Sequence, residues 1–150
     1  MTTTHDTLKK LREQLKRHEG AVTDKRGNHK PYRCTAGKLT LGYGRNIEDR
    51  GITDAEAEHL LDCDIIKSTS ELSSALRFYS QLDDVRQAVL INMHFNLGLG
   101  RLLTFRKTLA AIGQGDYKTA SAEMLDSRWA RQVGSRAVEL AEQMRTGMLR

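Results

Sequence analysis

The sequence contains few of the residues that interrupt helices or favour strands. Only one proline occurs among 150 residues, and aromatic residues make up 5 % of the chain. The good helix formers alanine, leucine, glutamate, glutamine, lysine and arginine recur throughout. Because strands favour aromatic and β-branched side chains, this composition argues against a β-sandwich or barrel and predicts a mainly helical chain.

Long apolar runs and cysteine clusters are also missing. The opening segment, MTTTHDTLKKLREQLKRHEG, is too polar to be a signal peptide or a membrane anchor. We therefore expect a protein that is cytoplasmic when made and has no stable membrane anchor. The two cysteines, Cys34 and Cys63, form no metal-type pair, and the five histidines lack ligand spacing. No metal or cofactor is expected, and a disulfide between the two thiols is not required.

Positive charge, in contrast, is in excess. The net charge of +5 suits an anionic partner, which could be nucleic acid, an acidic lipid surface or an anionic cell-wall polymer. A nucleic-acid-binding protein would concentrate lysine and arginine on one face. Here aspartate and glutamate are interspersed through nearly every predicted helix, so nucleic acid is not the expected partner.

A first helix is predicted to end at an acidic residue. Leu8, Leu11 and Leu15 recur at helical spacing, and Gly20 supplies the stop. Glu19 therefore lies at the C-terminal end of this helix, where the helix dipole disfavours negative charge. A structural role would favour lysine or arginine there, so this carboxylate indicates a functional role.

A hairpin is predicted shortly afterwards, in the stretch PYRCTAGKLTLGYGRN. The segment TAGK forms the turn, and the alternation that follows turns Thr40 away from Leu39 and Leu41, towards an open side. Gly42 and Gly44 allow a ligand or another backbone segment to approach closely. Cys34 precedes the turn, so the hairpin brings a thiol and a hydroxyl onto adjoining strands.

Helices account for the rest of the sequence. Thr53 to Glu56, TDAE, is a capping box that starts one helix. The segment that begins at about Gln81 is apolar around its circumference, which predicts a buried central helix ending at LGLG. Shorter helices are predicted around residues 104–112, 116–126 and 135–148.

The predicted fold class is thus α+β, mainly α. We expect a single domain over residues 1–150, long enough to bury about 70 % of its unfolded surface. A small hairpin lobe covers about 21–52. A helical lobe covers about 53–150 and includes the first helix, with a cleft between the two lobes.

A carboxylic acid that faces a second polar group is the minimum requirement for cleaving a glycosidic bond. One group protonates the leaving oxygen, and the other activates water or attacks the sugar carbon. Glu19 can be the acid, and Cys34 can be the base or nucleophile if it is partly thiolate. Thr40 can hold a water molecule beside Cys34.

These residues also resemble the signature of the phage-type lysozymes of glycoside hydrolase family 24. That signature is a glutamate at the end of a first helix, then an aspartate or cysteine, then a threonine in a G-x-x-T-x-G-x-G hairpin. The chain has Glu19 in HEG, Cys34 in YRCTAG and Thr40 in GKLTLGYG. The resemblance continues through GITDAEAEHLLDCDI, AVLINMHFNLG and SRWARQVGSRA. It implies a lysozyme-like fold.

The resemblance implies a role for individual residues. Glu19 would be the general acid, Cys34 would occupy the aspartate or cysteine position, and Thr40 would position the hydrolytic water. Arg136 would pair with the catalytic glutamate, and Asn96 would line the sugar subsites. The resemblance also implies that Gly42 lies near substrate. It further implies an ion pair between Arg45 and Asp64 that ties the hairpin to the helix that follows.

One departure from the family is a longer connection. Fourteen residues, Gly20 to Arg33, separate Glu19 from Cys34, more than family members usually have. The surplus is polar and either forms a tolerated surface loop or lines the cleft with basic groups. Asp24 is an alternative second carboxylate, but no hairpin is predicted to fix it, so we interpret it as a solvated loop acid.

The resemblance also implies a biological role. The protein would be an endolysin, a muramidase that cleaves the β-1,4 bond between N-acetylmuramic acid and N-acetylglucosamine in peptidoglycan for host lysis. It would be monomeric and would wait in the host cytoplasm until a separate holin releases it to the cell wall. Two alternatives stay open, a virion-associated wall-degrading lysozyme and a non-catalytic peptidoglycan-binding relative.

Overall fold

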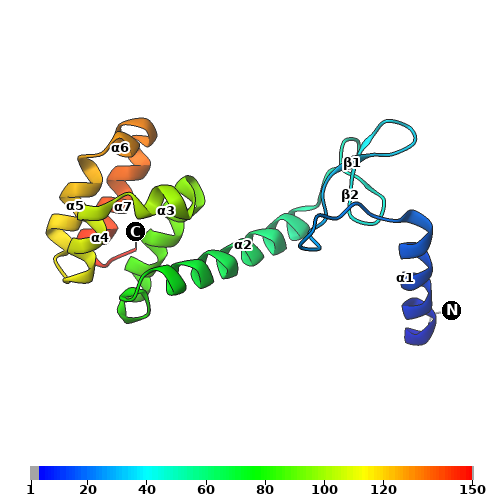
Figure 1. Cartoon of the computed structure of the whole chain (residues 1–150), viewed down its shortest axis with the longest axis horizontal. Helices are drawn as coiled ribbons and strands as arrows, with labels where there is room; N and C mark the ends of the chain where they lie inside the picture. Colours follow the sequence, from blue (N-terminus) through cyan, green and yellow to red (C-terminus); the bar gives the residue numbers. More distant parts are fainter. Residues whose placement is uncertain (1–3, 150) are drawn as a thin grey trace. The chain divides into compact units, whose positions relative to one another are not determined.

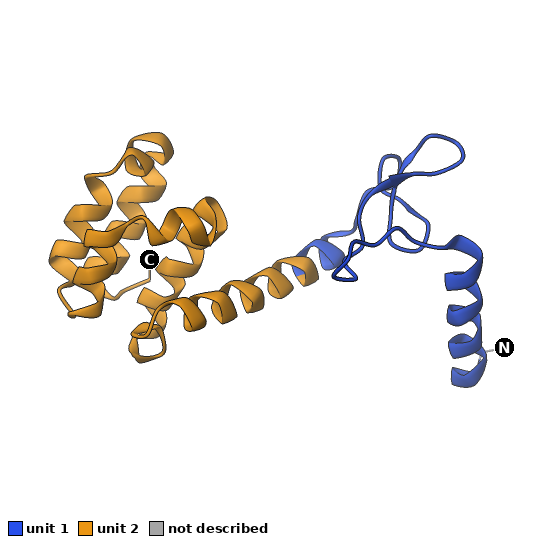
Figure 2. Ribbon diagram, in the orientation of Figure 1, with its two compact units in different colours: residues 1–58 blue, residues 59–150 orange. Residues whose placement is uncertain are grey.

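The computed structural model describes residues 4–149 and confirms the predicted fold class (Figure 1). In this range it contains seven α-helices, one short 3-10 helix and a three-stranded antiparallel sheet. Two compact units divide the chain, Met1–Glu58 and His59–Arg150 (Figure 2). Across the described residues, no helix combines the length and the hydropathy needed to cross a bilayer.

Helix α1, His5–Glu19, opens the first unit and confirms the predicted first helix. Thr4 caps its start, because the Thr4 side chain accepts a hydrogen bond from the Thr7 amide. Gly20 ends it with a φ of 67° and donates its N–H to the carbonyl of Lys16. The positive φ at Gly20 turns the chain away immediately after Glu19.

The sheet of the first unit has the strand order β1-β2-β3. The strands are β1 (Tyr32–Arg33), β2 (Leu39–Leu41) and β3 (Arg45–Asn46). Thr40 is central, since it is paired with Tyr32 on one side and with Asn46 on the other. The predicted hairpin is confirmed. Strand β3 was not predicted, because two residues are too few to show the alternation of a strand.

The first unit has almost no buried interior. In residues 4–58 only Thr40 is buried, and α1 buries none of its residues. The unit is instead held by turns, hydrogen bonds and ion pairs. Thr40 was predicted to face an open side, and this is wrong, because only 2 % of its surface is exposed.

Helix α2, Asp54–Ala75, begins at the predicted capping box. The Glu56 amide donates to Thr53 Oγ1 over 3.2 Å, and the Thr53 amide donates to Glu56 Oε1 over 2.9 Å. Arg45 also binds Glu56, with Nη2 2.8 Å from Oε2. The side chain of Glu56 thus joins β3 to the start of α2.

The second unit contains the rest of α2 and five further α-helices. The central helix α3 extends further than predicted, because the chain leaves helical geometry only at Gly98 and then resumes it. Helix α6 was not predicted, since six residues are too few to show helical periodicity. The 3-10 helix η1 covers Tyr79–Gln81. The α-helices are α3 (Asp84–Leu103), α4 (Arg106–Gly113), α5 (Tyr117–Leu125), α6 (Arg128–Val133) and α7 (Ser135–Thr146).

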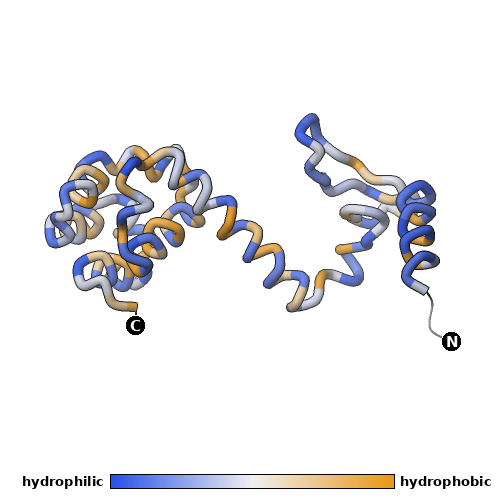
Figure 3. Tube along the Cα trace, turned by 90° about the horizontal axis from the view of Figure 1, so that it is seen from below, coloured by the Kyte–Doolittle hydropathy of each residue, from blue (hydrophilic) through white to orange (hydrophobic). Residues whose placement is uncertain are grey.

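The hydrophobic core of the described residues lies entirely in this second unit. Its helices alternate hydrophobic and hydrophilic residues along the chain, as amphipathic packing requires (Figure 3). Leu72 of α2, Met93 of α3 and Met144 of α7 are fully buried. Trp129 of α6 also belongs to this core, with 4 % of its surface exposed.

Three polar residues on α3 are each hydrogen-bonded to a different helix. Asn92 accepts from Arg136 of α7, His94 bonds to α2, and Asn96 accepts from Trp129 of α6. His94 uses both ring nitrogens, with Nδ1 3.0 Å from Ser68 Oγ and Nε2 2.7 Å from Glu71 Oε2. Each of the three side chains therefore has a partner on another helix, although Asn92 and Asn96 are exposed and His94 is half-buried.

We predict that Ser68→Ala lowers the free energy of unfolding by about 1–2 kcal/mol, because it leaves Nδ1 of His94 without its partner. Ser73→Ala is the matched control on the exposed side of the same helix, and alanine there should be neutral or slightly stabilising. Urea unfolding of both variants measures the difference. Equal effects would contradict a stabilising role for the Ser68–His94 contact.

Candidate active site

Glu19 lies against the turn between β2 and β3. A Cβ atom placed on Gly44 would be 2.7 Å from Glu19 Oε2 and 3.0 Å from its Cδ, closer than real Cβ contacts come. Gly44 also has a φ of 79°, which favours glycine in its own right. The sequence predicted a close approach at these hairpin glycines, and the group that approaches is the carboxylate of Glu19. The space beside Gly42 is open.

Cys34 opens the tight turn that leads from β1 to β2. The Cys34 amide donates to the carbonyl of Lys38 over 3.0 Å, and the Gly37 amide donates to the carbonyl of Cys34 over 2.8 Å. This geometry points two further amides, those of Lys38 and Ala36, at the sulfur. Both cysteines are free thiols.

The pKa of the Cys34 thiol is held below its ordinary value. The largest cause is the Lys38 amide, followed by the Ala36 amide, and both stabilise the thiolate. Partial burial acts in the opposite direction and is outweighed, while the Thr40 hydroxyl lowers the pKa further. Backbone amides and a hydroxyl, and not a cationic side chain, are therefore the groups that stabilise the thiolate.

Thr40 links the thiol to the backbone of the turn. Its Oγ1 donates to the carbonyl of Lys38 over 2.9 Å and also lies within hydrogen-bonding reach of Cys34. A hydroxyl has one proton to donate. Thr40 can therefore donate either to the carbonyl or to the thiolate, and ionisation of Cys34 favours the second arrangement.

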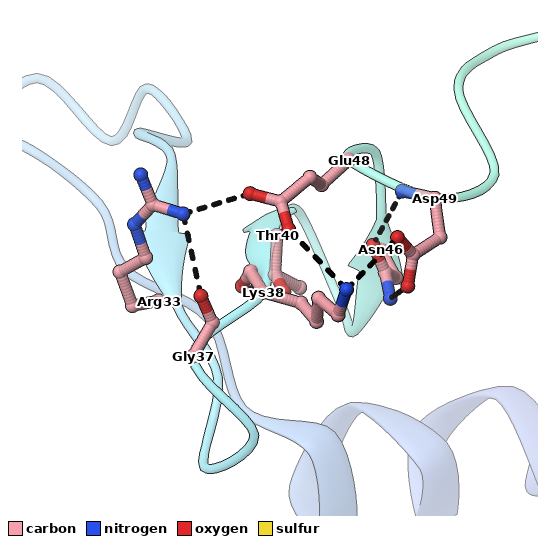
Figure 4. A network of polar contacts seen from close by, with 7 residues as sticks. All are labelled: Arg33, Gly37, Lys38, Thr40, Asn46, Glu48 and Asp49. Carbon is pink, nitrogen blue, oxygen red and sulfur yellow. Dashed lines mark hydrogen bonds and ion pairs between the residues drawn. The ribbon is translucent and has the colours of Figure 1, made fainter.

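Ion pairs connect this turn to residues that follow β3 (Figure 4). Arg33 Nη1 lies 2.8 Å from Glu48 Oε1 and 3.3 Å from the carbonyl of Gly37. Lys38 Nζ lies 3.1 Å from Asp49 Oδ1 and 3.6 Å from Glu48 Oε2. These contacts attach both ends of the Cys34 turn to the segment that follows β3.

The lengthened connection contains a second turn built like the first. An isolated bridge pairs Thr23 with His29. Asp24 donates its amide to the carbonyl of Asn28 over 2.9 Å, and Gly27 donates to the carbonyl of Asp24 over 3.0 Å. The interpretation of Asp24 as an acid that no hairpin fixes is therefore wrong.

The side chain of Asp24 is held as the thiol of Cys34 is. Oδ1 of Asp24 accepts from the amides of Arg26, at 2.8 Å, and Asn28, at 3.0 Å. The Asn28 amide is the largest cause that lowers the pKa of Asp24, and burial opposes it. A repeat at ten-residue spacing, Asp24-x-x-Gly27 and Cys34-x-x-Gly37, is the sequence signal that reveals the second turn.

The second turn is anchored beside Gly44. The ring of His29 meets that of Tyr43 edge to face, with centroids 5.0 Å apart. Lys16 of α1 lies over the same Tyr43 ring at 5.7 Å. The lengthened connection therefore packs onto the β2–β3 turn that Glu19 contacts.

The other predicted residues have these contacts. Arg136 donates from Nε and Nη2 to Asn92 Oδ1, at 2.9 and 2.7 Å. Asn96 accepts from Trp129 Nε1 at 2.6 Å. Arg45 pairs with Glu56 and not with the predicted Asp64, and the side-chain hydrogen bond from Arg45 is the largest cause that lowers the pKa of Glu56 to about 2.

Comparison with known proteins gives a consistent result. The model of a family described as phage lysozyme matches residues 16–145, which include Glu19, Cys34 and Thr40. An endolysin of Acyrthosiphon pisum secondary endosymbiont phage 1 is 33 % identical over 121 residues, 78 % of this chain and 75 % of its own length.

Two relatives come from Dictyostelium discoideum. The protein named probable T4-type lysozyme 1 is 32 % identical over 101 residues, 65 % of this chain, and the chain spans 59 % of that protein's length. Probable T4-type lysozyme 2 is 25 % identical over 169 residues, 93 % of this chain and 96 % of its own length.

We predict that Gly44→Ala and Gly42→Ala each cost about 1–2 kcal/mol of stability, because both positions have positive φ. Only Gly44→Ala should displace the Glu19 carboxylate. Carboxyl-carbon chemical shifts in protein labelled with ¹³C-glutamate measure that displacement. An equal shift of the Glu19 resonance in Gly42→Ala would contradict the contact.

Cys34 should react with iodoacetamide as a thiolate at lower pH than an ordinary cysteine does, because its pKa is lowered. Alkylation rates measured against pH in a Cys63→Ser background report Cys34 alone. Thr40→Val should move the midpoint to higher pH, since it removes a hydroxyl that stabilises the thiolate. A midpoint at the ordinary value in the Cys63→Ser protein would contradict the role of the two amides.

Proposed function

The chain belongs to the phage lysozyme family, and on this premise we propose that it is a muramidase of bacterial peptidoglycan. The bond cleaved is the β-1,4 linkage between N-acetylmuramic acid and N-acetylglucosamine. One observation carries the proposal: the Glu19 carboxylate lies against Gly44, in the same hairpin that lowers the pKa of Cys34. An acid and an ionisable thiol on one small scaffold are the two groups that glycoside hydrolysis requires.

In this mechanism Glu19 donates a proton to the glycosidic oxygen, so that the sugar leaves as an alcohol. Cys34, as a thiolate, removes a proton from water or attacks the anomeric carbon. Thr40 keeps the lone pairs of its hydroxyl oxygen free whether it donates to the carbonyl of Lys38 or to the Cys34 thiolate, so it can accept a hydrogen bond from the attacking water. Roles of Arg136 and Asn96 in the mechanism are supported by the family resemblance alone, since their own side-chain contacts are to Asn92 and Trp129.

The proposed role is that of an endolysin. The protein accumulates in the host cytoplasm as a monomer and reaches the wall after a holin opens the membrane. The net charge of +5 would hold the enzyme to an anionic wall. Turnover is then expected to fall as salt screens this attraction.

The test is turnover on purified peptidoglycan by Glu19→Gln, Cys34→Ser and Cys34→Asp. We expect Glu19→Gln to lose activity by about 10²- to 10⁴-fold, the usual contribution of a general acid, and Cys34→Ser to be similarly impaired. Cys34→Asp should retain activity, because Asp24 shows that this type of turn holds a carboxylate by two amides. Cys63→Ser and Asp24→Asn are the controls and should leave turnover unchanged.

Other outcomes identify the alternatives. If Cys34→Ser is fully active, the second catalytic group is another residue, with Asp24 the first candidate. A wild-type protein that binds purified walls but releases no reducing sugar would be a non-catalytic peptidoglycan-binding relative. Detection of the protein in purified virions would support a virion-associated lysozyme.

A further inference from the structure

The lengthened connection between α1 and β1 holds much of the positive charge of the protein. Residues 20–33 contain one acid, Asp24, and four cations, Lys25, Arg26, Lys30 and Arg33. They therefore account for +3 of the net charge of +5. Arg33 is paired with Glu48, and Lys30 lies 3.8 Å from the carboxylate of Asp24. The remaining two cations are the ones available for contacts outside the chain.

These two cations, Lys25 and Arg26, form the tip of the Asp24 turn. The hydrogen bond from the Gly27 amide to the Asp24 carbonyl closes a β-turn with the two residues at its centre. Both side chains are exposed, and within residues 4–149 neither has an ion pair or a side-chain hydrogen bond. The turn thus presents two adjacent cations whose donors are all available.

The Cys34 turn provides an internal comparison. It is closed by the same two backbone hydrogen bonds, and its glycine also has a positive φ. Its two central residues are Thr35 and Ala36, which carry no charge. A turn of this type therefore does not need cations at its centre. Local structure does not explain Lys25 and Arg26, so their charges indicate a role in binding.

The tip belongs to the unit that contains the proposed catalytic groups. His29 takes part in the bridge at the base of the turn, and its ring packs edge to face on Tyr43. Tyr43 directly precedes Gly44, against which the Glu19 carboxylate lies. A ligand held at the tip is therefore held on the unit that carries the general acid.

The composition and position of the tip limit its ligand. The tip is the exposed end of a hairpin, so it can contact only groups that protrude from a partner. Lys25 to Asn28 include no apolar or aromatic side chain. The tip therefore has nothing to insert into a bilayer and nothing on which a nucleic-acid base could stack. Phosphate groups along a polymer suit it, because one phosphate can accept hydrogen bonds from two neighbouring cations.

We propose that the tip formed by Lys25 and Arg26 binds phosphate groups carried by a glycan polymer of the bacterial envelope. The proposal rests on the proposed function, because it names the anionic partner that holds the enzyme to the wall. Lys25 supplies a point charge, and the guanidinium of Arg26 can form two parallel hydrogen bonds with phosphate oxygens. The lengthened connection thus contributes to attachment and not to the chemical step.

Binding is tested with the full chain carrying Glu19→Gln, so that no bond is cleaved. The probes are inorganic polyphosphate and polyglutamate with the same number of charges, titrated by calorimetry. Lys25→Thr with Arg26→Ala gives the turn the central residues of the Cys34 turn, so the turn should stay folded. We expect this double variant to bind polyphosphate at least tenfold more weakly. The slope of log Kd against log salt should fall by roughly 1.5, since each phosphate contact contributes about 0.7–0.9.

A matched control removes the same charge from the same unit. Lys9→Gln with Arg12→Gln changes two exposed cations of α1 that have no ion pair among the described residues. This control should bind polyphosphate within twofold of the parent protein. Equal losses in both double variants would assign the effect to net charge and overturn the proposal. Equal or tighter binding of polyglutamate by the parent would overturn it as well, because the tip would then not select phosphate.

Envelope fractions identify the source of the phosphate. Purified walls that carry a phosphorylated polymer should bind the parent protein more tightly than the same walls after the polymer is extracted. The Lys25–Arg26 double variant should bind both kinds of wall alike. Vesicles that contain phosphatidylglycerol should bind the parent more weakly than the intact walls do. Tighter binding to the vesicles, or wall binding that extraction does not change, would overturn the proposal.

Turnover separates this proposal from the proposed function. On walls that carry the polymer, the Lys25–Arg26 double variant should raise KM with little change in kcat, and on extracted walls it should match the parent enzyme. A loss of kcat on extracted walls would overturn the proposal. Because calorimetry does not need cleavage, an inactive wild-type protein would refute the muramidase function while the polyphosphate titration still decides the binding site. Lys25→Gln with Arg26→Gln repeats the test if the first double variant does not fold.

Discussion

The approach of the Glu19 carboxylate to Gly44 is the constraint on which the first unit depends. It needs a helix that stops at Glu19, a glycine that stops it, and a second glycine that leaves room for the carboxylate. The unit has almost no buried interior to hold these parts by packing. Their placement relies on backbone hydrogen bonds, the ion pairs of Arg33 and Lys38, and the contact of His29 with Tyr43.

Two turns of the same construction present different groups to solvent. Each uses two amides to stabilise an anion, a carboxylate at Asp24 and a thiolate at Cys34. The turn therefore supplies the electrostatic environment, and the residue at its first position selects the chemistry. This division explains how either an aspartate or a cysteine can serve at the position that the family resemblance assigns to Cys34.

The sequence predicted the parts of the fold that depend on local signals. The end of α1 followed from the spacing of Leu8, Leu11 and Leu15 and from Gly20, and the start of α2 followed from the capping box at Thr53. Elements that are too short for periodicity were missed, namely β3 and α6. Alternation gave the wrong environment for Thr40, because it shows which side chains share a face of a strand and not whether that face is covered, and Thr40 is buried.

The candidate site was predicted in the same way. Glu19 and Cys34 were identified from motif and position, and the hairpin glycines from their need for space. The ordered turn at Asp24 was missed, since a turn-rich polar segment does not show whether its side chains bond to its own backbone. The partners of Arg136 and Asn96, which are Asn92 and Trp129, depend on contacts distant in sequence and could not be read from local pattern.

The contacts that three polar side chains of α3 make with other helices limit the length changes that the helical unit tolerates. Asn92, His94 and Asn96 reach α7, α2 and α6 respectively. One inserted or deleted residue among them would rotate everything downstream by roughly 100° about the helix axis. At least one partner would then be lost, so length changes within this segment are expected to destabilise the helical unit.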